Sequence, residues 1–405
     1  MLTHAAYPHM RHKKAHLGIC GSIAAYKGVD LLRALLASGM SAGTTLTESA
    51  QQFLTPLTFQ ALGADPVHSR FFGNEATPFA HLEPGQKSDI MVIAPATAGM
   101  IAKIATGLSD DLLSCQVLAH SGPLVIAPSM NHRMWSATAT RENWDRLKSR
   151  GNTCIEPETG PMACGESGKG RFPCVGTIMA HVGKALADQD LHGKDVLITL
   201  GPTREYLDPV RFLSNPSSGL MGQALALAAW MRGARVHVVQ GPVESTLPSD
   251  IVTTRVQSAQ EMYDACIGLW ETMDIGCLVD AVSDFRPQSP AESKLKKTEL
   301  KDDHLSIPFL PNPDILADLG KRKKGRQILV GFAAETDSVI SNAQSKLSAK
   351  NLDLIVANRV GPADSGFEAT TNRVHLLDAN GNSEEWDLLP KTEIAWCLWD
   401  RISEL

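Results

Sequence analysis

The chain has 405 residues, of which 43% are hydrophobic and 20% charged, an ordinary composition for a globular protein of two or three domains. Its 44 acidic and 38 basic residues give a net charge of −6, which argues against a general nucleic-acid-binding protein. No apolar run reaches the roughly 18 residues that span a membrane, and the first residues lack the apolar stretch of a secretory signal. The eight cysteines contain no C-x-x-C pair, so we expect a soluble cytoplasmic protein with reduced thiols.

The N-terminal residues end in the basic run Met10–Lys14, and we expect residues 1–15 to form a disordered tail. Strand and helix patterns then alternate. The expected elements are a strand at His16–Cys20, a helix at about Ile23–Ser38, and buried strands at Ile90–Ala94 and Leu124–Ala127.

A second cycle of the same kind begins near residue 191. Its expected strands are Asp195–Leu200, Arg235–Gln240, Ile275–Ala281, Gln327–Phe332 and Leu354–Ala357, and its helices are Ser217–Arg232 and Lys391–Glu404. The alternation predicts an α/β protein with two Rossmann-like domains. We expect a flavodoxin-like domain at residues 16–190 and a second domain with a mainly parallel sheet at residues 191–405.

Ligands of open parallel sheets bind beyond the carboxyl ends of the strands, where helix N-termini offer unpaired N–H groups. No complete G-x-G-x-x-G follows either first strand, so the standard dinucleotide fingerprint is missing. Gly21-Ser22 is nevertheless a compact strand-to-helix turn that can hold one phosphate.

Four motifs in the first half occur in a recognisable order. They are G-S-I-A-A-Y-K (Gly21–Lys27), A-P-A-T (Ala94–Thr97), P-S-M-N-H-R-M-W (Pro128–Trp135) and M-A-C-G-E-S-G-K-G-R (Met162–Arg171). With them, residues 16–185 resemble the homo-oligomeric flavin-containing cysteine decarboxylases. The resemblance implies FMN as cofactor, and the matching positions are Gly21, Ser22, Thr47, Ala94, Pro95, Ala96, Thr97, Ser109, Asp110 and Asp111.

Decarboxylation of an N-acylated cysteine requires an electron sink, because loss of CO2 otherwise leaves an unstabilised carbanion. Oxidation of the CH2–SH group by flavin to a thioaldehyde places the carboxylate β to a C=S group. CO2 then leaves to give an enethiolate, which is protonated and reduced back.

The resemblance also implies three active-site residues. His81 handles protons or positions the substrate, and the amide of Asn131 binds the substrate carboxylate. Cys164, among glycines in a mobile flap, protonates the enethiolate. From the sequence pattern alone, His81 is interpreted as a surface histidine and Asn131 as part of an Asx turn. A zinc site of Cys154, Cys164 and Cys174 fails on its spacing.

Six motifs follow in the second half: G-P-T-R-E (Gly201–Glu205), Asp208–Gly219, D-F-R-P (Asp284–Pro287), K-L-K-K (Lys294–Lys297), P-N-P-D-I-L (Pro311–Leu316) and G-F-A-A-E-T (Gly331–Thr336). In this order residues 191–400 resemble the phosphopantothenate–cysteine ligase domain. The fusion of the two halves resembles the bifunctional enzymes of coenzyme A synthesis.

A free carboxylate acylates poorly, so ligation needs a mixed anhydride with a nucleotide, and the triphosphate needs cations. Lys294 is one candidate, and Lys346 and Lys350 share one helical face. The resemblance assigns CTP, bound by Asp284, Lys294, Pro311, Asn312, Pro313, Asp314, Phe332, Lys346 and Lys350. Arg211 and Asn215 match positions that handle the acyl-cytidylate. The triphosphate implies Mg2+, but the sequence contains no protein-only metal site.

Two features of the sequence argue against the predicted nucleotide site of the second half. The family usually has a small apolar residue where this chain has Asp280, and a carboxylate beside a triphosphate repels it unless it points away or binds Mg2+. Lys294–Lys297, taken alone, is typical of a solvated loop, and Ser217-Ser218 of a helix N-cap.

The favoured interpretation is therefore ligation of 4'-phosphopantothenate to cysteine with CTP, followed by FMN-dependent decarboxylation to 4'-phosphopantetheine. One alternative is a decarboxylase of peptide C-terminal cysteines, against which the ligase half argues. Another is a non-catalytic binding protein that inhibits a phosphatase, against which the presence of His81, Asn131 and Cys164 argues. The resemblance suggests trimeric decarboxylase units, with flavin between subunits, joined by dimeric ligase units.

Overall fold

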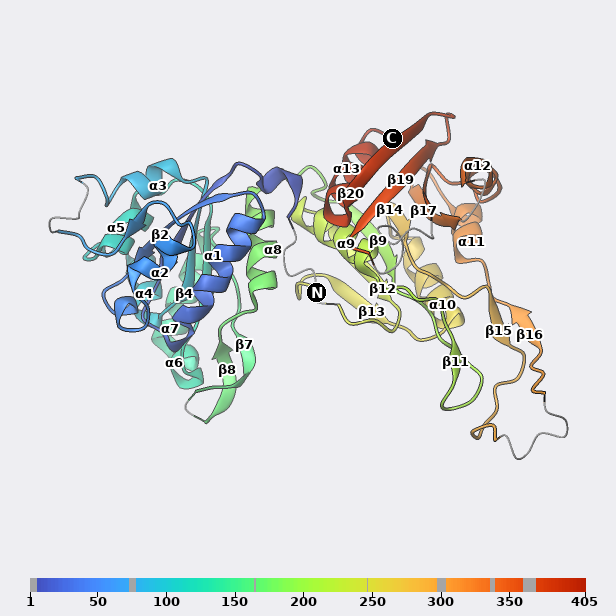
Figure 1. The fold of residues 1–405 in the computed structure, drawn as a ribbon, viewed down its shortest axis with the longest axis horizontal. Coiled ribbons are helices and arrows are strands. Elements are labelled where there is room, and N and C mark those ends of the chain that lie inside the picture. Colours follow the sequence, from blue (N-terminus) through green and yellow to red (C-terminus); the bar gives the residue numbers. More distant parts are fainter. Residues whose placement is uncertain are drawn as a thin grey trace. The chain divides into compact units, whose positions relative to one another are not determined.

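The computed structural model describes residues 6–72, 78–163, 165–245, 247–296, 304–335, 339–359 and 369–405. The chain divides into two compact units, Met1–Asp188 (unit 1) and Gln189–Leu405 (unit 2), each built around its own sheet (Figure 1). The described cysteines are free thiols. Among the described residues, no helix is long and apolar enough to cross a membrane.

Unit 1 contains a parallel sheet in the order β3-β2-β1-β4-β5-β6. The strands are β1 (Lys14–Ile19), β2 (Ser41–Leu46), β3 (Val67–His68), β4 (Ile90–Ala96), β5 (Leu124–Pro128) and β6 (Thr153–Cys154). The expected fold class is confirmed, and within it the strand order is that of the Rossmann arrangement. The order reverses between β1 and β4, so the loops that follow these two strands diverge and leave a crevice.

Helices cover both faces of this sheet, as a parallel sheet requires. They are α1 (Lys27–Ala37), α2 (Pro56–Ala61), α3 (Glu83–Lys87), α4 (Ala98–Thr106), α5 (Leu112–Leu118), α6 (His132–Ser136), α7 (Thr138–Ser149) and α8 (Val175–Leu186). Helix α1 packs against α8, and α4 against α7. Short 3-10 helices lie at η1 (Pro8–Met10), η2 (Ile23–Tyr26) and η3 (Ala50–Gln52), and a hairpin forms from β7 (Glu158–Pro161) and β8 (Ser167–Arg171).

The expected disordered tail over residues 1–15 is wrong for residues 6–15. Tyr7 and Met10 are fully buried, and the ring of His9 hydrogen-bonds the carbonyl of Gly183 on α8 at 3.0 Å. Strand β1 begins at Lys14, inside the basic run. Burial of Tyr7 and Met10 in the core therefore stabilises this segment more than repulsion among its basic residues destabilises it.

Unit 2 contains a larger sheet in the order β13-β12-β9-β14-β17-β18-β19-β20, which is parallel from β13 to β18 and antiparallel at β19 and β20. Its strands are β9 (Asp195–Leu200), β12 (Arg235–Gln240), β13 (Val252–Arg255), β14 (Ile275–Leu278), β17 (Ile328–Glu335), β18 (Leu354–Arg359), β19 (Thr371–Asp378) and β20 (Ser383–Pro390). Its helices are α9 (Leu220–Met231), α10 (Ala259–Trp270), α11 (Ile315–Arg322), α12 (Val339–Ala349) and α13 (Lys391–Ser403). Two small ribbons pair β10 (Glu205–Tyr206) with β11 (Phe212–Leu213), and β15 (Phe285–Pro287) with β16 (Phe309–Pro311).

Helix α9 is buried on all sides, because it packs on β9 and β12 and is itself covered by α13. The indole of Trp399 on α13 donates to the carbonyl of Leu225 at 3.0 Å. The sequence predicts this helix from Ser217, but it begins at Leu220 after Gly219, which has a φ of +71°. A Cβ at Gly219 would lie 3.1 Å from Val243, so both conformation and space favour glycine there.

His16 is a buried histidine on β1 whose environment favours the neutral ring. Burial, with smaller contributions from His68 and His120, lowers its pKa to about 3, and its Nε2 lies 2.7 Å from Thr45 Oγ1. In the unfolded chain the ring titrates near 6.5, so the unfolded state binds the extra proton between these two values.

We therefore expect the free energy of unfolding to fall as the pH drops from about 6.5 towards 3, and a His16→Gln variant to lose less. Between pH 7 and pH 4 the difference between the two proteins is expected to change by about 3 kcal/mol. Urea denaturation of both proteins at the two pH values measures it. An equal difference at both pH values contradicts the assignment.

Candidate active sites

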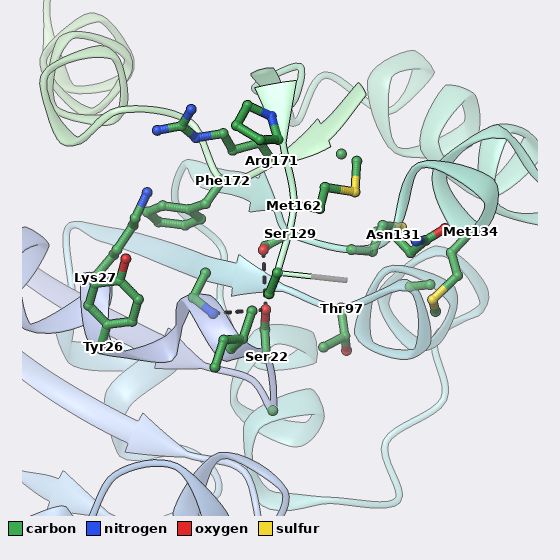
Figure 2. Close-up of a pocket in the computed structure, with 18 residues that line it drawn as sticks. Ser22, Tyr26, Lys27, Thr97, Ser129, Asn131, Met134, Met162, Arg171 and Phe172 are labelled. Atoms are coloured by element: carbon green, nitrogen blue, oxygen red, sulfur yellow. Dashed lines mark hydrogen bonds between the residues drawn. The ribbon is translucent and has the colours of Figure 1, made fainter. Parts of the chain in front are cut away.

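A pocket of about 580 Å³ lies at the carboxyl end of the unit 1 sheet, in the crevice beside β1 and β4 (Figure 2). Its walls come from the segment after β1 (Gly21–Lys27), the start of α4, the segment after β5 (Ser129–Met134) and the β7–β8 hairpin. Four chain segments far apart in sequence thus meet at one edge of the sheet.

The turn after β1 is fixed by its own hydrogen bonds. Ser22 Oγ accepts from the N–H of Ala24 at 3.2 Å and donates to Ser129 Oγ at 3.1 Å, which ties this turn to the segment after β5. A Cβ at Gly21 would lie 2.4 Å from Cβ of Ser49, so only glycine fits. Thr97 caps α4 by accepting from the N–H of Met100 at 3.3 Å.

Asn131 is held so that its amide donates. Its Oδ1 accepts from the N–H of Arg133 at 2.8 Å, and its Nδ2 donates to Glu166 at 2.9 Å. The Arg133 guanidinium donates to the same carboxylate at 2.8 Å, and His132 Nδ1 lies 3.5 Å from it. The segment after β5 therefore binds a carboxylate of the protein itself, that of Glu166.

The residues predicted for flavin divide into two groups. Gly21, Ser22 and Thr97 line the pocket, whereas Ala94, Pro95 and Ala96 lie within the buried strand β4. In the described part of the chain, Thr47, Ser109, Asp110 and Asp111 are not among the lining residues.

Their contacts show what these other residues do in the single chain. Thr47 Oγ1 accepts from the N–H of Ala50 at 3.2 Å, and Lys103 Nζ bridges Asp110 at 2.6 Å and Asp111 at 2.5 Å. Burial raises the pKa of Asp111, but hydrogen bonds from Lys103 and Ser114 outweigh it and hold that pKa below its usual value.

The two proton-handling candidates are not part of the described pocket wall. His81 stacks on Phe71, with ring centroids 5.9 Å apart, and the preceding carbonyl of Ala80 accepts from the buried amide of Gln116 at 2.7 Å. Cys164 lies outside the described residues, between the pocket-lining residue Ala163 and Gly165.

The pocket wall contains further residues to which the sequence patterns assigned no role. Tyr26, Lys27, Met134, Arg171 and Phe172 all line the pocket, and their side chains appear around it in Figure 2. The Lys27 ammonium lies 5.9 Å from the centre of the Phe172 ring. Four of the five lie within the motifs and Phe172 directly follows one, but spacing alone did not show which side chains turn inward.

Unit 2 has two adjoining cavities of about 290 Å³ and 370 Å³ at the carboxyl ends of β14 and β17. Both are lined by Asp280, Val282, Asp284 and Phe332. Of the residues predicted for CTP or the acyl-cytidylate, the structure brings together Asn215, Asp284, Asn312, Pro313, Asp314, Phe332, Lys346 and Lys350 around them.

Backbone-directed hydrogen bonds hold these loops together. Asn312 Nδ2 donates to the carbonyl of Ser283 at 2.7 Å, and Asn215 Nδ2 donates to the carbonyl of Val282 at 3.0 Å. The ammonium of Lys350 pairs with Asp314 at 2.8 Å, and Asp314 also caps α11. The segments that contain Asn215, Val282–Asp284 and Asn312–Asp314 therefore form one continuous wall of the cavities.

Three predicted residues are not among the described lining residues of these cavities: Pro311, Lys294 and Arg211. The carbonyl of Pro311 accepts from Arg286 at 2.8 Å. Arg211 Nη2 donates to the carbonyl of Leu295 at 3.0 Å, which places the neighbouring Lys294 beside the loop that carries Arg211. These two cations therefore lie outside the described walls of the cavities.

Asp280, the departure from the family pattern, lies in the wall of both cavities. Its carboxyl group is hydrogen-bonded by the hydroxyl of the buried Thr199. Burial raises the pKa of Asp280, which favours the neutral acid. The carboxyl group of Asp280 is therefore part of the cavity wall, and its protonation state determines whether the wall carries a negative charge there.

Sequence reasoning missed the far wall of the 370 Å³ cavity, which contains Asn358, Asn372 and Lys391. Lys391 is 3% exposed, and burial lowers its pKa to about 8. Within the described residues, Oδ1 of Asn372 has no hydrogen-bond partner. No local motif marks them, since they lie on β18, on β19 and at the start of the last helix.

A third cavity of about 350 Å³ lies on the other side of the segment Asn215–Ser217 and is lined also by Arg204, Phe212 and Ser214. The Arg204 guanidinium stacks over the Phe212 ring at 4.6 Å. Among the residues that the structure describes, no group of three or more His, Cys, Asp or Glu side chains is arranged to hold a metal ion.

Comparison with known proteins gives matches over both units. Residues 4–187 match the family Flavoprotein, and residues 191–405 match the DNA/pantothenate metabolism flavoprotein C-terminal domain. The chain is 42% identical over 370 residues to the Coenzyme A biosynthesis bifunctional protein CoaBC of Vibrio vulnificus (strain CMCP6), covering 91% of this chain and 92% of that protein. It is 40% identical over 402 residues to the protein of the same name from Bacillus subtilis (strain 168), covering 98% of each. A crystal structure of the C-terminal domain of such a protein is 37% identical, covers 54% of this chain and 97% of that chain, and has a TM-score of 0.46.

Proposed function

Since the chain belongs to the family of Coenzyme A biosynthesis bifunctional proteins, we propose that unit 2 joins 4'-phosphopantothenate to cysteine with CTP and that unit 1 decarboxylates the product. The observation that carries the proposal is the presence of two different sites. The unit 1 pocket lies at the reversal between β1 and β4, and the 370 Å³ cavity of unit 2 is lined by the segments after β9 and β14, where that sheet reverses. The unit 1 site has a turn suited to a phosphate and side chains that donate hydrogen bonds to a carboxylate. The unit 2 site has lysines and amides around adjoining cavities.

In unit 2 the proposed first step is attack of the phosphopantothenate carboxylate on the α-phosphorus of CTP, which releases pyrophosphate. Lys346 and Lys350 lie one helical turn apart at the end of α12 and offset the charge of the triphosphate, which Mg2+ accompanies. Lys350 exchanges Asp314 for phosphate oxygens. The amine of cysteine then attacks the acyl carbon, and CMP leaves.

Asn215 and Ser217 line both the 370 Å³ cavity and the third cavity. This position supports a role for Asn215 at the junction between nucleotide and acid, where the acyl-cytidylate forms. The third cavity then receives the acid, and Arg204 is placed to meet its phosphate.

In unit 1 the residues present fit a flavin. The Gly21–Ser22 turn approaches Ser49 too closely for any Cβ, offers backbone N–H groups for a phosphate, and opens on a pocket of about 580 Å³. When bound, flavin supplies the two-electron oxidation that creates the electron sink, and the later reduction. Asn131 and Arg133 bind the substrate carboxylate, and Cys164 supplies the proton to the carbon that has lost CO2.

We propose that the decarboxylase site is completed between copies of unit 1. His81 is outside the described wall of the pocket. Large apolar side chains are exposed both in the pocket wall (Ile23, 61%) and in the segments beside His81 (Phe72, 82%; Phe79, 60%). Exposed apolar groups of this size are typical of association surfaces. A trimer that buries them brings the histidine of one copy to the pocket of another.

Three variants separate the two reactions. We expect Asn215→Asp and Lys294→Gln to lower formation of the cysteine adduct by at least about 100-fold, because each removes transition-state stabilisation. We expect Cys164→Ser to form the adduct and stall before phosphopantetheine, because it removes the proton donor. Incubation with phosphopantothenate, cysteine and CTP, with separation of the products, measures all three.

Lys321→Gln is the matched control, since Lys321 is an exposed lysine on α11 paired with Asp318 at 2.8 Å. It is expected to leave both reactions unchanged. Normal decarboxylation by Cys164→Ser removes the proposed role of that thiol, and absence of CMP release by the unaltered protein removes the ligase proposal.

The glycine of the phosphate turn provides a second test. In Gly21→Ala the new methyl group must displace Ser49, so we expect purified protein to retain at least about tenfold less flavin. Absorbance at 450 nm against protein concentration measures it. Gly176→Ala is the control, since the nearest atom to a Cβ there is Cys174 Sγ at 4.0 Å; equal flavin in both variants contradicts the assignment.

Asp280→Asn tests the charge in the nucleotide cavities. The amide oxygen still accepts from Thr199 but carries no charge, so we expect the KM for CTP to fall by about threefold at pH 8.5. Because burial favours the neutral acid, we expect this gain to be larger at higher pH, where more of the carboxyl group is ionised in the unaltered protein. A raised KM with a higher Mg2+ requirement shows instead that the carboxylate helps to hold the cation. Glu271→Gln, an exposed carboxylate paired with Lys324, is the control.

A further inference from the structure

Glu166 lies at the start of the returning arm of the β7–β8 hairpin, next to the segment that follows β5. Its carboxylate accepts from Asn131 Nδ2 at 2.9 Å and from Arg133 Nη2 at 2.8 Å. These are the donors that the substrate carboxylate requires. A carboxylate of the protein itself therefore occupies the carboxylate-binding position.

The hairpin is shaped to bring Glu166 there. The N–H of Met130 donates to the carbonyl of Gly170 at 3.0 Å, so β8 lies directly on the segment after β5. A Cβ at Gly168 would lie 2.8 Å from His132, and one at Gly170 would lie 2.3 Å from the carbonyl oxygen of Met130. The N–H of Met162 donates to the carbonyl of Glu166 at 2.9 Å, which closes the turn of the hairpin.

The same contacts are weak enough to exchange. The Arg133 side chain is 77% exposed and that of Glu166 is 36% exposed, so water competes for both. Exposed ion pairs contribute little to stability. The Asn131 amide is different, because its Oδ1 is fixed by the N–H of Arg133 and its donor end keeps its direction when the acceptor changes.

We propose that Glu166 is an internal competitor for the substrate carboxylate: it occupies the donors of Asn131 and Arg133 in the free enzyme, yields them to the substrate, and returns when CO2 has left. The inference rests on the decarboxylase function proposed for unit 1. Substrate and product differ by that one carboxylate, so only the substrate has to displace Glu166. Return of Glu166 then closes the carboxylate position against a product that has no group to fill it.

The test uses two inhibitors that differ only by a carboxylate. The serine analogue of the substrate keeps the carboxylate and lacks the thiol, and the ethanolamine analogue lacks both. Their inhibition constants are measured against decarboxylation by the flavin-loaded full chain, for the unaltered protein, Glu166→Gln and Glu166→Ala. Glu158→Gln is the matched control, since Glu158 lies on the same hairpin and accepts from the N–H of Cys174 at 2.7 Å.

We expect both Glu166 variants to bind the serine analogue about three- to tenfold more tightly and the ethanolamine analogue unchanged, and the control to match the unaltered protein. Weaker binding of both analogues shows that Glu166 only supports the hairpin, and unchanged binding of both shows that it does not compete; either result overturns the proposal. Absence of CO2 release by the unaltered protein instead overturns the decarboxylase function itself.

Discussion

Both sites depend on one constraint, the reversal of strand order in a parallel sheet. The segments that follow β1 and β4 run in opposite directions, and so do those that follow β9 and β14. The backbone N–H groups just after these strands have no partners in the sheet. Short polar residues fill these positions: Ser22 and Thr97 cap the helices that follow in unit 1. The sheets therefore determine where ligands bind, and the loops determine which ligands.

The loops differ in the polar groups that they fix. In unit 1 the amide of Asn131 is oriented by its cap on α6, so it meets an incoming ligand as a donor. In unit 2 the amides of Asn215 and Asn312 donate to backbone carbonyls and fix the loops themselves. The same residue type thus presents a donor at the pocket wall in one unit and joins the loops of the cavity wall in the other.

Sequence patterns predicted the fold class and much of the site walls, because strand ends and helix starts are local features. Gly21, Ser22, Thr97 and Asn131 each lie within a motif and meet in one pocket. The failures have a common physical reason, which is that they depend on contacts between distant segments. Burial of Tyr7 and Met10 needs the rest of unit 1, and the place of Lys391 in a cavity wall needs the fold of β18 and β19. Glu166 was inside a quoted motif, but its partners lie more than thirty residues earlier.

Ion pairs in the chain fall into two kinds, and the difference bears on function. Arg232 is 5% exposed and holds Asp190 and Asp400 across unit 2, so removal of either partner leaves a buried charge. Burial raises the pKa of Glu156, but hydrogen bonds from Lys148, Lys169 and Trp144 outweigh it and hold that pKa at about 2. These pairs are multiply bonded and belong to the framework.

At the two sites the paired carboxylates are Glu166, which accepts from Asn131 and Arg133, and Asp314, which pairs with Lys350 and caps α11. Glu166 on Arg133 and Asp314 on Lys350 each place an internal carboxylate on a cation that we propose to bind a ligand anion. An unpaired cation at such a position attracts any anion, whereas a weakly held internal partner excludes only those that bind less well than it does. In the proposed reactions, ligand anions therefore exchange with these internal carboxylates at the sites, whereas the carboxylates of the framework pairs stay in place.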